Sequence, residues 1–594
     1  MTIISTRTIS RCLIALLLGL LSVASGAQDW RNIETGSEIP AEGYADMPLV
    51  VTLNDGSWLC TLTTGPGREG APGQYVIATR STDQGQTWSE PVPISPRITK
   101  HGSESSWVVP LHVPHQGSEK FGRVYAFYVT NGDNITEVPG LEERDNDRVD
   151  MLGWYVYRFS DDGGETWSAQ TRIDIPKTDA DLNNTFGGKV QMFWGVDEPI
   201  STDERTLIAL TKIRTHLVTD TEGWLLACDN LTAETDPAKH EWRLLPMGND
   251  GDPQTWKGLR SETNFRTTQA EHDLTALNKP GHFILINRTD TGVLSISRST
   301  DNGSTWSEPE PMTYPDGSAI RNPRANAKVW KTKHGRYLLW FHNHGGTRFE
   351  DRNPGWLAGG IEHDEQIKWS QPEIALYHND PSVRISYPDL IEDSGRYWIT
   401  ETEKETARVH EIDASLIEGL WAQLDDQHTP PTDTLTEPAS IDFGAGQGFS
   451  IALAFSNYDL ATLSVLASSD DERDGWTIRA VRGPSIEIEL RSEGQTYTWQ
   501  SDRVPSVAGK THHAVITFDS GPAIVTMTIN GKVHDGTGKR QFGWGRFPRK
   551  FPPISLMPSQ NDDIQIFARA LRTSEAVELY EACREALDAI TAIL

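Results

Sequence analysis

An eight-residue pattern, Ser-x-Asp-x-Gly-x-Thr-Trp, constrains the fold of this chain more than any other feature. It occurs at residues 81–88, 160–167 and 299–306. In each copy the Asp can bond nearby backbone amides and the Gly tolerates positive φ, so the pattern specifies a tight turn. The Trp can pack beneath that turn as a plug. Three copies of one turn indicate a repeat architecture.

The distribution of these tryptophans predicts the number of repeats. Weaker echoes of the pattern occur at Trp242 and Trp369, and with them the plug positions become nearly evenly spaced. Short β-type runs such as 124–128 and 337–341 alternate with turn signals between the plugs. Each unit is long enough for a four-stranded sheet. The sequence therefore predicts an all-β fold that begins with a six-bladed β-propeller at 28–424, its last blade closed by both ends of that region.

The composition and residue pattern of the chain change after the predicted propeller. Residues 425–438 are polar and Pro-containing, which is typical of a linker. Alternating strands and an Asn-Gly hairpin turn then predict an antiparallel β-sandwich (jelly roll) at 439–572, whose strand order resembles laminin-G-like or concanavalin-A-like domains. Residues 573–594 are amphipathic. They predict a C-terminal helix, capped by Ser574, that packs against the sandwich.

The first 27 residues are predicted to be a signal peptide. Two arginines precede an apolar run of about a dozen residues, and small residues follow at a cleavage position. That run is short for a membrane span, and no second run of spanning length occurs. We therefore expect a secreted protein, periplasmic or extracellular, with no stable membrane span.

Charge and cysteine content exclude further classes of partner. The chain has 83 acidic and 54 basic residues, for a net charge of -29, which disfavours binding to nucleic acid. Cys60, Cys228 and Cys583 remain after the predicted cleavage. Their spacing fits no metal site, so we expect free thiols with at most one bridge, and neither a metal nor a cofactor.

The repeat and its spacing resemble the sialidase (neuraminidase) superfamily, in which such Asp boxes lie on the outer rim of a six-bladed propeller. The boxes imply the fold and not an activity. The resemblance extends to Tyr387, within Ser-Tyr-Pro-Asp-Leu, and to Glu271 and Arg288, which precede the third box. It implies that Tyr387 is a nucleophile, that Glu271 activates it, and that Arg288 holds the carboxylate of the substrate.

The rest of the family's site matches less well. Arg352 is our candidate for a further substrate-binding arginine, with Arg324 or Arg348 as alternatives. Ala45 stands where the family carries its first arginine. The family's acidic residue before the first box has no clear counterpart. Glu69 is the only acidic residue in that region, and we prefer Glu104 as the replacement acid.

Other polar clusters supply further candidates. Asp46, His101 and His344 are proposed to contact substrate. His342 and His344 could also bind a metal, but two histidines without a carboxylate partner are weak evidence for that.

The residue types suit the chemistry that the resemblance implies. A sialic acid carries a carboxylate on its anomeric carbon, which repels an anionic nucleophile, whereas a phenol is neutral until it loses its proton. Because the pKa of tyrosine is about 10, the phenol needs a base beside it. Glycosidases of this type are the Tyr-nucleophile exception to the usual pair of carboxylates.

The leading hypothesis is therefore a secreted, exo-acting glycoside hydrolase of sialidase type that removes a terminal, acidic sugar from a glycan. Two alternatives stay open. One is a polysaccharide lyase acting on a uronic-acid glycan. The other is a glycan-binding propeller without activity, which the loss of an arginine at Ala45 would favour.

Overall fold

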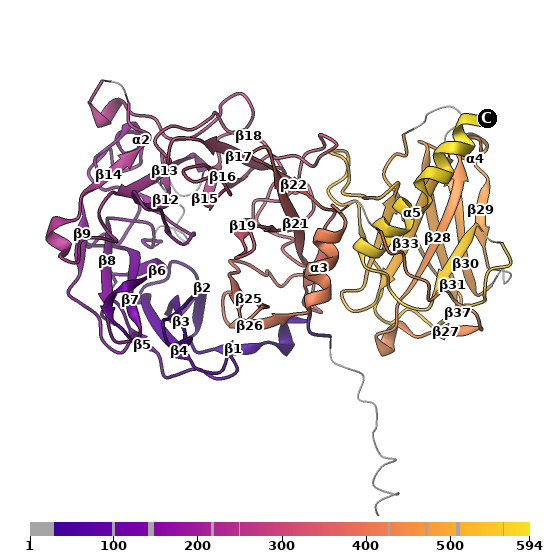
Figure 1. The fold of residues 1–594 in the computed structure, drawn as a ribbon, viewed down its shortest axis with the longest axis horizontal. Coiled ribbons are helices and arrows are strands. Elements are labelled where there is room, and N and C mark those ends of the chain that lie inside the picture. Colours follow the sequence, from indigo (N-terminus) through magenta and orange to yellow (C-terminus); the bar gives the residue numbers. More distant parts are fainter. Residues whose placement is uncertain are drawn as a thin grey trace, which may run out of the picture.

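The computed structural model describes residues 29–97, 101–140, 148–215, 219–248, 250–425, 428–469, 473–505, 511–561 and 563–593. The predicted signal peptide lies outside these residues. The chain forms a ring of small sheets beside a second body of packed sheets (Figure 1). This arrangement confirms the predicted all-β fold class, a six-bladed propeller followed by a sandwich and a C-terminal helix.

Six antiparallel sheets make the blades of the ring. Blade one comprises β2 (Tyr44–Thr52), β3 (Trp58–Gly65), β4 (Tyr75–Ser81) and β5 (Val92–Pro93). Blade two comprises β6 (Ser105–Ser118), β7 (Gly122–Thr130), β8 (Trp154–Ser160) and β9 (Thr171–Ile173). Blade three comprises β10 (Phe193–Trp194), β12 (Thr206–Ile213), β13 (Thr221–Cys228) and β14 (Trp242–Leu245), with β11 (Ile200–Ser201) on β12.

The remaining blades follow the same order. Blade four comprises β15 (Gln269–Ala276), β16 (Phe283–Thr289), β17 (Leu294–Ser299) and β18 (Glu310–Pro311). Blade five comprises β19 (Lys328–Lys331), β20 (Tyr337–Phe341), β21 (Gly355–His363) and β22 (Gln366–Trp369), with β23 (Glu373–Leu376) on β21. Blade six comprises β24 (Leu390–Asp393), β25 (Arg396–Thr402), β26 (Ala407–Ile412) and, from the start of the chain, β1 (Ser37–Ile39).

The ring is closed by the two ends of the propeller. Strand β1 pairs antiparallel with β26, with Ile39 opposite Ala407. Ile39 is buried beside the aromatic contact between Trp58 of blade one and Trp398 of blade six, whose ring centroids are 5.1 Å apart. Closure of this kind leaves no long unpaired edge in the ring.

The three Asp boxes form nearly identical turns. In the first, Asp83 accepts hydrogen bonds from the amide (2.9 Å) and hydroxyl (2.6 Å) of Thr87. Asp162 and Asp301 make the same two bonds within their own boxes. The two weaker echoes are different, because Trp242 begins β14 and Trp369 ends β22 without such a turn. The even spacing of the tryptophans therefore reflects the spacing of the blades. Blades one, two and four carry an Asp box.

The second body is an antiparallel sandwich. Its larger sheet contains β35 (Lys532–Val533), β34 (Ile524–Ile529), β33 (Thr511–Asp519), β28 (Phe449–Ser456) and β38 (Ile564–Phe567), with β36 (Gly545–Arg546) on β34. Its smaller sheets contain β29 (Val465–Ser468), β30 (Gly475–Val481), β31 (Ser485–Ser492) and β32 (Gln495–Gln500), and the pair β27 (Ala439–Ile441) and β37 (Ile554–Leu556). The exact domain limits stay a prediction.

Helices are few and mostly short in the part of the chain that the structure describes. They are η1 (Ile33–Thr35), α2 (Asp179–Asn183), η3 (Pro237–Lys239), η4 (Pro253–Thr255), α3 (Ala414–Ala422), η5 (Phe443–Ala445), α4 (Asn457–Thr462) and α5 (Thr573–Ile593). Helix α5 packs on the sandwich through Ala576 and Leu579, as predicted. Ser574 is not its cap, because α5 begins at Thr573 and the Ser574 hydroxyl donates to Glu373 of the propeller (2.9 Å).

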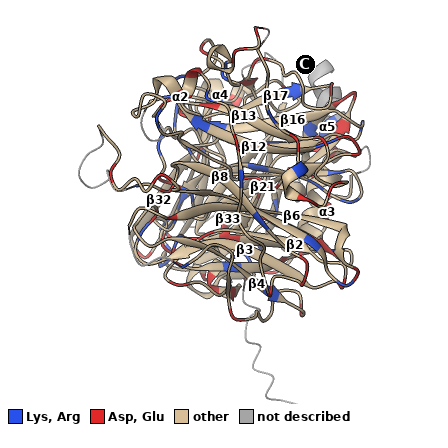
Figure 2. Cartoon of the chain, turned by 90° about the vertical axis from the view of Figure 1, so that its left-hand side faces the viewer, with Lys and Arg blue, Asp and Glu red and all other residues tan. Residues whose placement is uncertain are grey.

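Two further expectations concern the cysteines and the absence of a membrane span. Cys60, Cys228 and Cys583 are free thiols. Within the described residues, no helix is both long and apolar enough to cross a membrane. Acidic and basic residues are interspersed over the loops of the propeller in the view of Figure 2.

The closing strand generates a stability prediction. We expect Ile39→Ala to lower the free energy of unfolding by about 2–5 kcal/mol, because it leaves a cavity between the first and last blades. The matched control is Glu38→Ala in the same strand, since Glu38 is exposed. Thermal and urea unfolding followed by circular dichroism would measure both. Equal effects of the two substitutions would contradict the closure.

Candidate active site

Distorted segments of three blades direct side chains towards the centre of the ring. In β6 and β15 the strand register shifts at Trp107 and at Glu271, and both residues have positive φ (60° and 57°). Tyr387 also has positive φ (46°), just before β24. Such backbone costs about 1–3 kcal/mol per residue, and bulges re-aim side chains. Threonines of the preceding blades hold two of the bulges, because Thr63 and Thr211 accept hydrogen bonds from the amides of Trp107 (3.0 Å) and Glu271 (2.9 Å).

These side chains meet at one cavity of about 120 Å³. All six blades contribute to its wall, which places it at the axis. The lining residues are Glu69, Trp107, Arg148, Met151, Trp194, Glu271, Arg288, Phe349, Arg352, Arg384, Tyr387 and Lys404.

Three larger cavities lie away from the axis. One, of about 250 Å³, is lined by residues of the propeller and the sandwich, including Asp29, Glu373 and Asp519. Another, of about 480 Å³, lies between β16, β17 and the 363–369 turn. The third, of about 380 Å³, lies in the sandwich between residues 482–485, 500–503 and 536–540. None of these three walls contains a phenol paired with a carboxylate, so the axial cavity is the candidate site.

Tyr387, Glu271 and Arg288 form a buried triad in this cavity. The Tyr387 hydroxyl donates to Glu271 Oε1 (2.6 Å), and Arg288 Nη1 lies 2.9 Å from Glu271 Oε2. Burial, and then the negative charge of Glu271, raise the pKa of Tyr387 well above its ordinary value, against the opposing effect of Arg288. At neutral pH the phenol therefore keeps its proton, and that proton already points at the carboxylate.

Arg352 and Arg324 lie beside this triad. Arg352 Nη1 donates to the Ser386 hydroxyl (2.9 Å), and its Nη2 donates to the carbonyl of Arg324 (3.2 Å). The Arg324 guanidinium lies 4.4 Å from the centroid of Phe349, and burial together with repulsion from Arg288 lowers its pKa to about 10. Among the described residues, the Nε atoms of Arg288 and Arg352 are buried and lack a hydrogen-bond partner. Unsatisfied donors on buried cations favour an anionic ligand.

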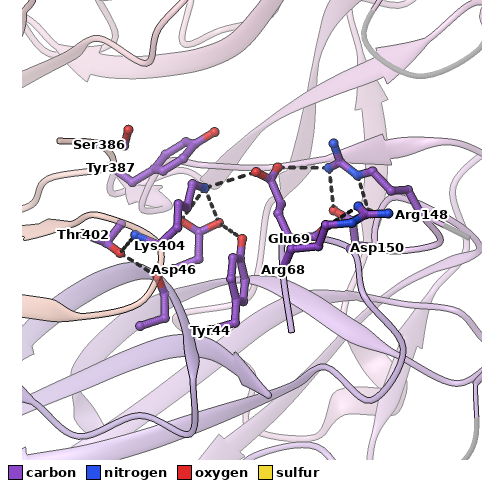
Figure 3. Close-up of polar contacts among 12 residues, drawn as sticks. Tyr44, Asp46, Arg68, Glu69, Arg148, Asp150, Ser386, Tyr387, Thr402 and Lys404 are labelled. Atoms are coloured by element: carbon purple, nitrogen blue, oxygen red, sulfur yellow. Dashed lines mark hydrogen bonds and ion pairs between the residues drawn. The ribbon is translucent and has the colours of Figure 1, made fainter. Parts of the chain in front are cut away.

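Lys404 brings a further cation to the cavity from the turn after β25 (Figure 3). Its Nζ lies 2.8 Å from both carboxylate oxygens of Asp46 and 4.1 Å from the centroid of the Tyr387 ring. Its carbonyl accepts a hydrogen bond from Ala45 (2.9 Å). A lysine of blade six thus stands next to the position on blade one where the sequence lacks an expected arginine.

Glu69 is the second carboxylate on the cavity wall. Arg148 lies 2.9 Å from it and Lys404 lies 3.6 Å from it. Burial would raise the pKa of Glu69, but Lys404, Arg148, Arg352 and Arg288 outweigh that effect and hold it well below its usual range. At neutral pH Glu69 is therefore a carboxylate.

The structure brings together four of the predicted site residues. Tyr387, Glu271, Arg288 and Arg352 all line the cavity. Asp46 lies behind Lys404, where it also accepts a hydrogen bond from the Tyr44 hydroxyl (2.5 Å).

Other predicted residues lie elsewhere. Glu104 is buried outside the cavity, where it accepts hydrogen bonds from His101 Nδ1 (2.7 Å) and the Gly102 amide (2.9 Å). This placement argues against Glu104 as the replacement acid, and the carboxylate that lines the cavity besides Glu271 is Glu69. The other ring nitrogen of His101 contacts the carbonyl of Thr136 (2.8 Å), so His101 supports a loop.

The histidines of blade five belong to the boundary with the sandwich. His344 contacts the carbonyl of Asp351 (2.7 Å), and its ring lies 4.6 Å from that of Phe542. A substrate contact for His344 is therefore not supported. His342 is buried against the carbonyl of Pro354 (3.1 Å). The described residues contain no cluster of three or more side chains suited to holding a metal.

Sequence reasoning missed several lining residues. Lys404 had a usable signal, because it lies in a turn directly after the strand that follows Tyr387. Arg148 and Trp194 had none, since no motif surrounds them and only the closed ring brings them to the axis.

The comparison with protein families agrees with the fold. The BNR repeat-like domain matches residues 56–399. Similar solved structures include the Hadza microbial sialidase Hz136, with 18% identity over 64% of this chain and 68% of that chain (TM-score 0.43). The intramolecular trans-sialidase from Ruminococcus gnavus has 15% identity over 66% and 99% (TM-score 0.44), and the Trypanosoma rangeli sialidase has 11% over 91% and 94% (TM-score 0.43). No curated protein matches the chain.

The buried ion pair generates a prediction. We expect Glu271→Ala to cost about 3–5 kcal/mol of stability, because it leaves Arg288 buried and unpaired. The double variant with Arg288→Ala should cost less than the sum of the single variants. The exposed pair Arg298 and Glu310 in the same blade is the matched control, with an expected coupling of at most about 1 kcal/mol. Equal coupling in the two cycles, measured by urea unfolding, would contradict the burial argument.

Proposed function

Because this chain belongs to the BNR repeat-like domain family, we propose that it is a glycoside hydrolase of sialidase type that removes a terminal acidic sugar. The family by itself fixes no activity. The observation that carries the proposal is the buried hydrogen bond from Tyr387 to Glu271, with unsatisfied donors of Arg288 and Arg352 beside it. A structural tyrosine does not require a buried carboxylate and arginines with unsatisfied Nε donors around it.

The charge of the cavity supports an anionic substrate. Its wall carries five basic residues and two acidic ones, whereas the whole chain has a net charge of -29. Guanidinium groups bind carboxylates as planar forks, so Arg288 and Arg352 would hold the carboxylate of the sugar. The cavity, of about 120 Å³, is too small to enclose an internal stretch of polysaccharide, which favours contact with the end of a glycan.

The proposed chemistry has two steps. Tyr387 Oη forms a bond to the anomeric carbon as its proton passes to Glu271, and the bond to the leaving oxygen breaks with its electron pair. Water then attacks the anomeric carbon, and Tyr387 leaves and recovers its proton from Glu271. Because the pKa of the phenol is raised, Tyr387 needs an adjacent carboxylate to accept its proton. Arg288 stabilises the negative charge of that carboxylate before the reaction.

Glu69 is the group proposed to exchange protons with the leaving oxygen and with water. It is the other carboxylate on the cavity wall, and it takes the role that the sequence suggested for Glu104. Secretion, predicted from residues 1–27, would place the enzyme where glycans are accessible.

Turnover by variants of Tyr387 tests the proposal. A panel of aryl glycosides of sialic and uronic acids would identify a substrate, and we expect Tyr387→Phe to lower kcat/KM by about 10³-fold or more. Tyr155→Phe is the matched control, because Tyr155 is buried outside the cavity and its hydroxyl has no hydrogen-bond partner among the described residues.

Two results would contradict the assignment. Products that absorb in the ultraviolet would indicate elimination by a lyase. Binding of acidic glycans without turnover of any glycoside would indicate a binding propeller.

A further inference from the structure

Five charged side chains form a row along one wall of the cavity (Figure 3). In order they are Asp46, Lys404, Glu69, Arg148 and Asp150, so that the sign of the charge alternates. Each cation is shared between two carboxylates. Lys404 lies between Asp46 and Glu69, and Arg148 lies between Glu69 and Asp150, from which it is 3.1 Å away.

The row is built from separate segments and is firmly held. The carboxylates at its two ends have side chains only 2% exposed, whereas that of Glu69 is 30% exposed and opens to the cavity. Gly70 has positive φ (74°), and a Cβ there would come within 2.6 Å of Asp150 Oδ1 and 2.8 Å of Arg148 Nε. The glycine therefore lets the Glu69 loop lie directly against the Arg148–Asp150 pair.

Two further cations around Glu69 act in the same direction. Arg288 and Arg352 approach from blades four and five and add positive charge, and the side chain of Arg68 donates to the Glu69 carbonyl (3.2 Å). The phenols of Tyr44 and Tyr387 are neutral at ordinary pH, because burial raises the pKa of each. The nearby anions, Asp46 and Asp150, are each bound to a cation of the row.

We infer that this row confines the cleavage of sugar–sugar linkages to acidic pH, because Lys404 and Arg148 keep Glu69 as a carboxylate in the resting enzyme. The inference rests on the proposed function. A carboxylate is ready to accept a proton from water in the second step. It has no proton to give to the leaving oxygen in the first step.

The two steps therefore differ in what they need from Glu69. When the anomeric C–O bond breaks, an alcohol oxygen must gain a proton as it takes the electron pair, whereas an aryl oxygen is stable enough to leave as an anion. Linkages with alkyl leaving groups should be cut only when Glu69 is protonated, and aryl glycosides should not depend on it. Substrate preference and pH dependence are thus set by the same two cations.

The first experiment compares methyl and 4-nitrophenyl α-glycosides of N-acetylneuraminic acid. For the wild-type enzyme, we expect kcat/KM on the methyl glycoside to rise as the pH falls from about 7 to about 4, and we expect no such rise for the 4-nitrophenyl glycoside. Removing a cation raises the pKa of Glu69, so Lys404→Met should move the rise to higher pH by about one to two units.

Variants of the row separate its effect from general damage. Arg148→Met removes the other cation and should shift the methyl-glycoside profile in the same direction, whereas Lys404→Arg keeps the charge and should leave the profile in its wild-type range. Glu69→Gln should abolish the rise. Identical profiles for the two glycosides, or an unmoved profile in both Lys404→Met and Arg148→Met, would overturn the inference.

A second measurement does not require turnover. A carboxyl whose pKa is depressed by folding stabilises the protein above its unfolded pKa, and that contribution is lost as the pH falls. Wild type should therefore exceed Glu69→Gln in apparent Tm by about 2 °C or more at neutral pH. The difference should shrink below about pH 4.3. If the difference in apparent Tm does not depend on pH, or is absent at neutral pH, the inference that the row keeps Glu69 ionised is overturned.

The two measurements keep the claims apart. If the wild-type enzyme cleaves neither glycoside, the proposed function fails on this sugar, and the unfolding series alone decides whether the row holds Glu69 ionised. If both glycosides are cleaved with the same pH profile, the proposed function stands and the inference about Glu69 fails.

Discussion

The site depends on keeping one carboxylate charged at the axis of a closed ring. Glu271 is only 2% exposed, and a buried charge without a partner would cost several kcal/mol. Arg288 supplies the opposite charge, and Tyr387 supplies the hydrogen bond to the second oxygen. The ring makes this possible because residues distant in the chain meet only at its centre. Positive φ at Glu271 and Tyr387 is the strain that this meeting requires.

The sandwich also contributes to the site, although it provides none of the residues that line the cavity. The segment carrying Phe349 and Arg352 runs along the boundary between the two bodies. Trp544 donates to the Asn343 carbonyl (2.9 Å), and Gln541 donates to Asp351 (2.7 Å). Side chains of the sandwich thus fix both ends of a loop that positions an arginine of the cavity, which gives the second body a structural role.

The sequence predicted the features that depend on neighbouring residues in the chain. The Asp boxes specify turns, and these turns together with the tryptophan spacing were sufficient to predict the ring. Tyr387, Glu271 and Arg288 were predicted from a family resemblance in the residues around them. Arg148 could not be found in this way, and the position of Lys404 after its strand did not reveal its role, because both residues act through alternating charge across three blades. Glu104 was a plausible candidate because it lies close in sequence to Trp107, which does line the cavity. Its carboxylate instead bonds to His101, outside the cavity.

The most direct test of this account is to identify the atom that becomes covalently attached to the sugar. A fluorinated sialosyl fluoride, which slows the second step, should leave a single sugar adduct on the peptide that contains Tyr387, detected by mass spectrometry of the digested protein. An adduct on Glu271 or Glu69, or inversion at the anomeric carbon without any adduct, would contradict the claim that the buried phenol is the nucleophile.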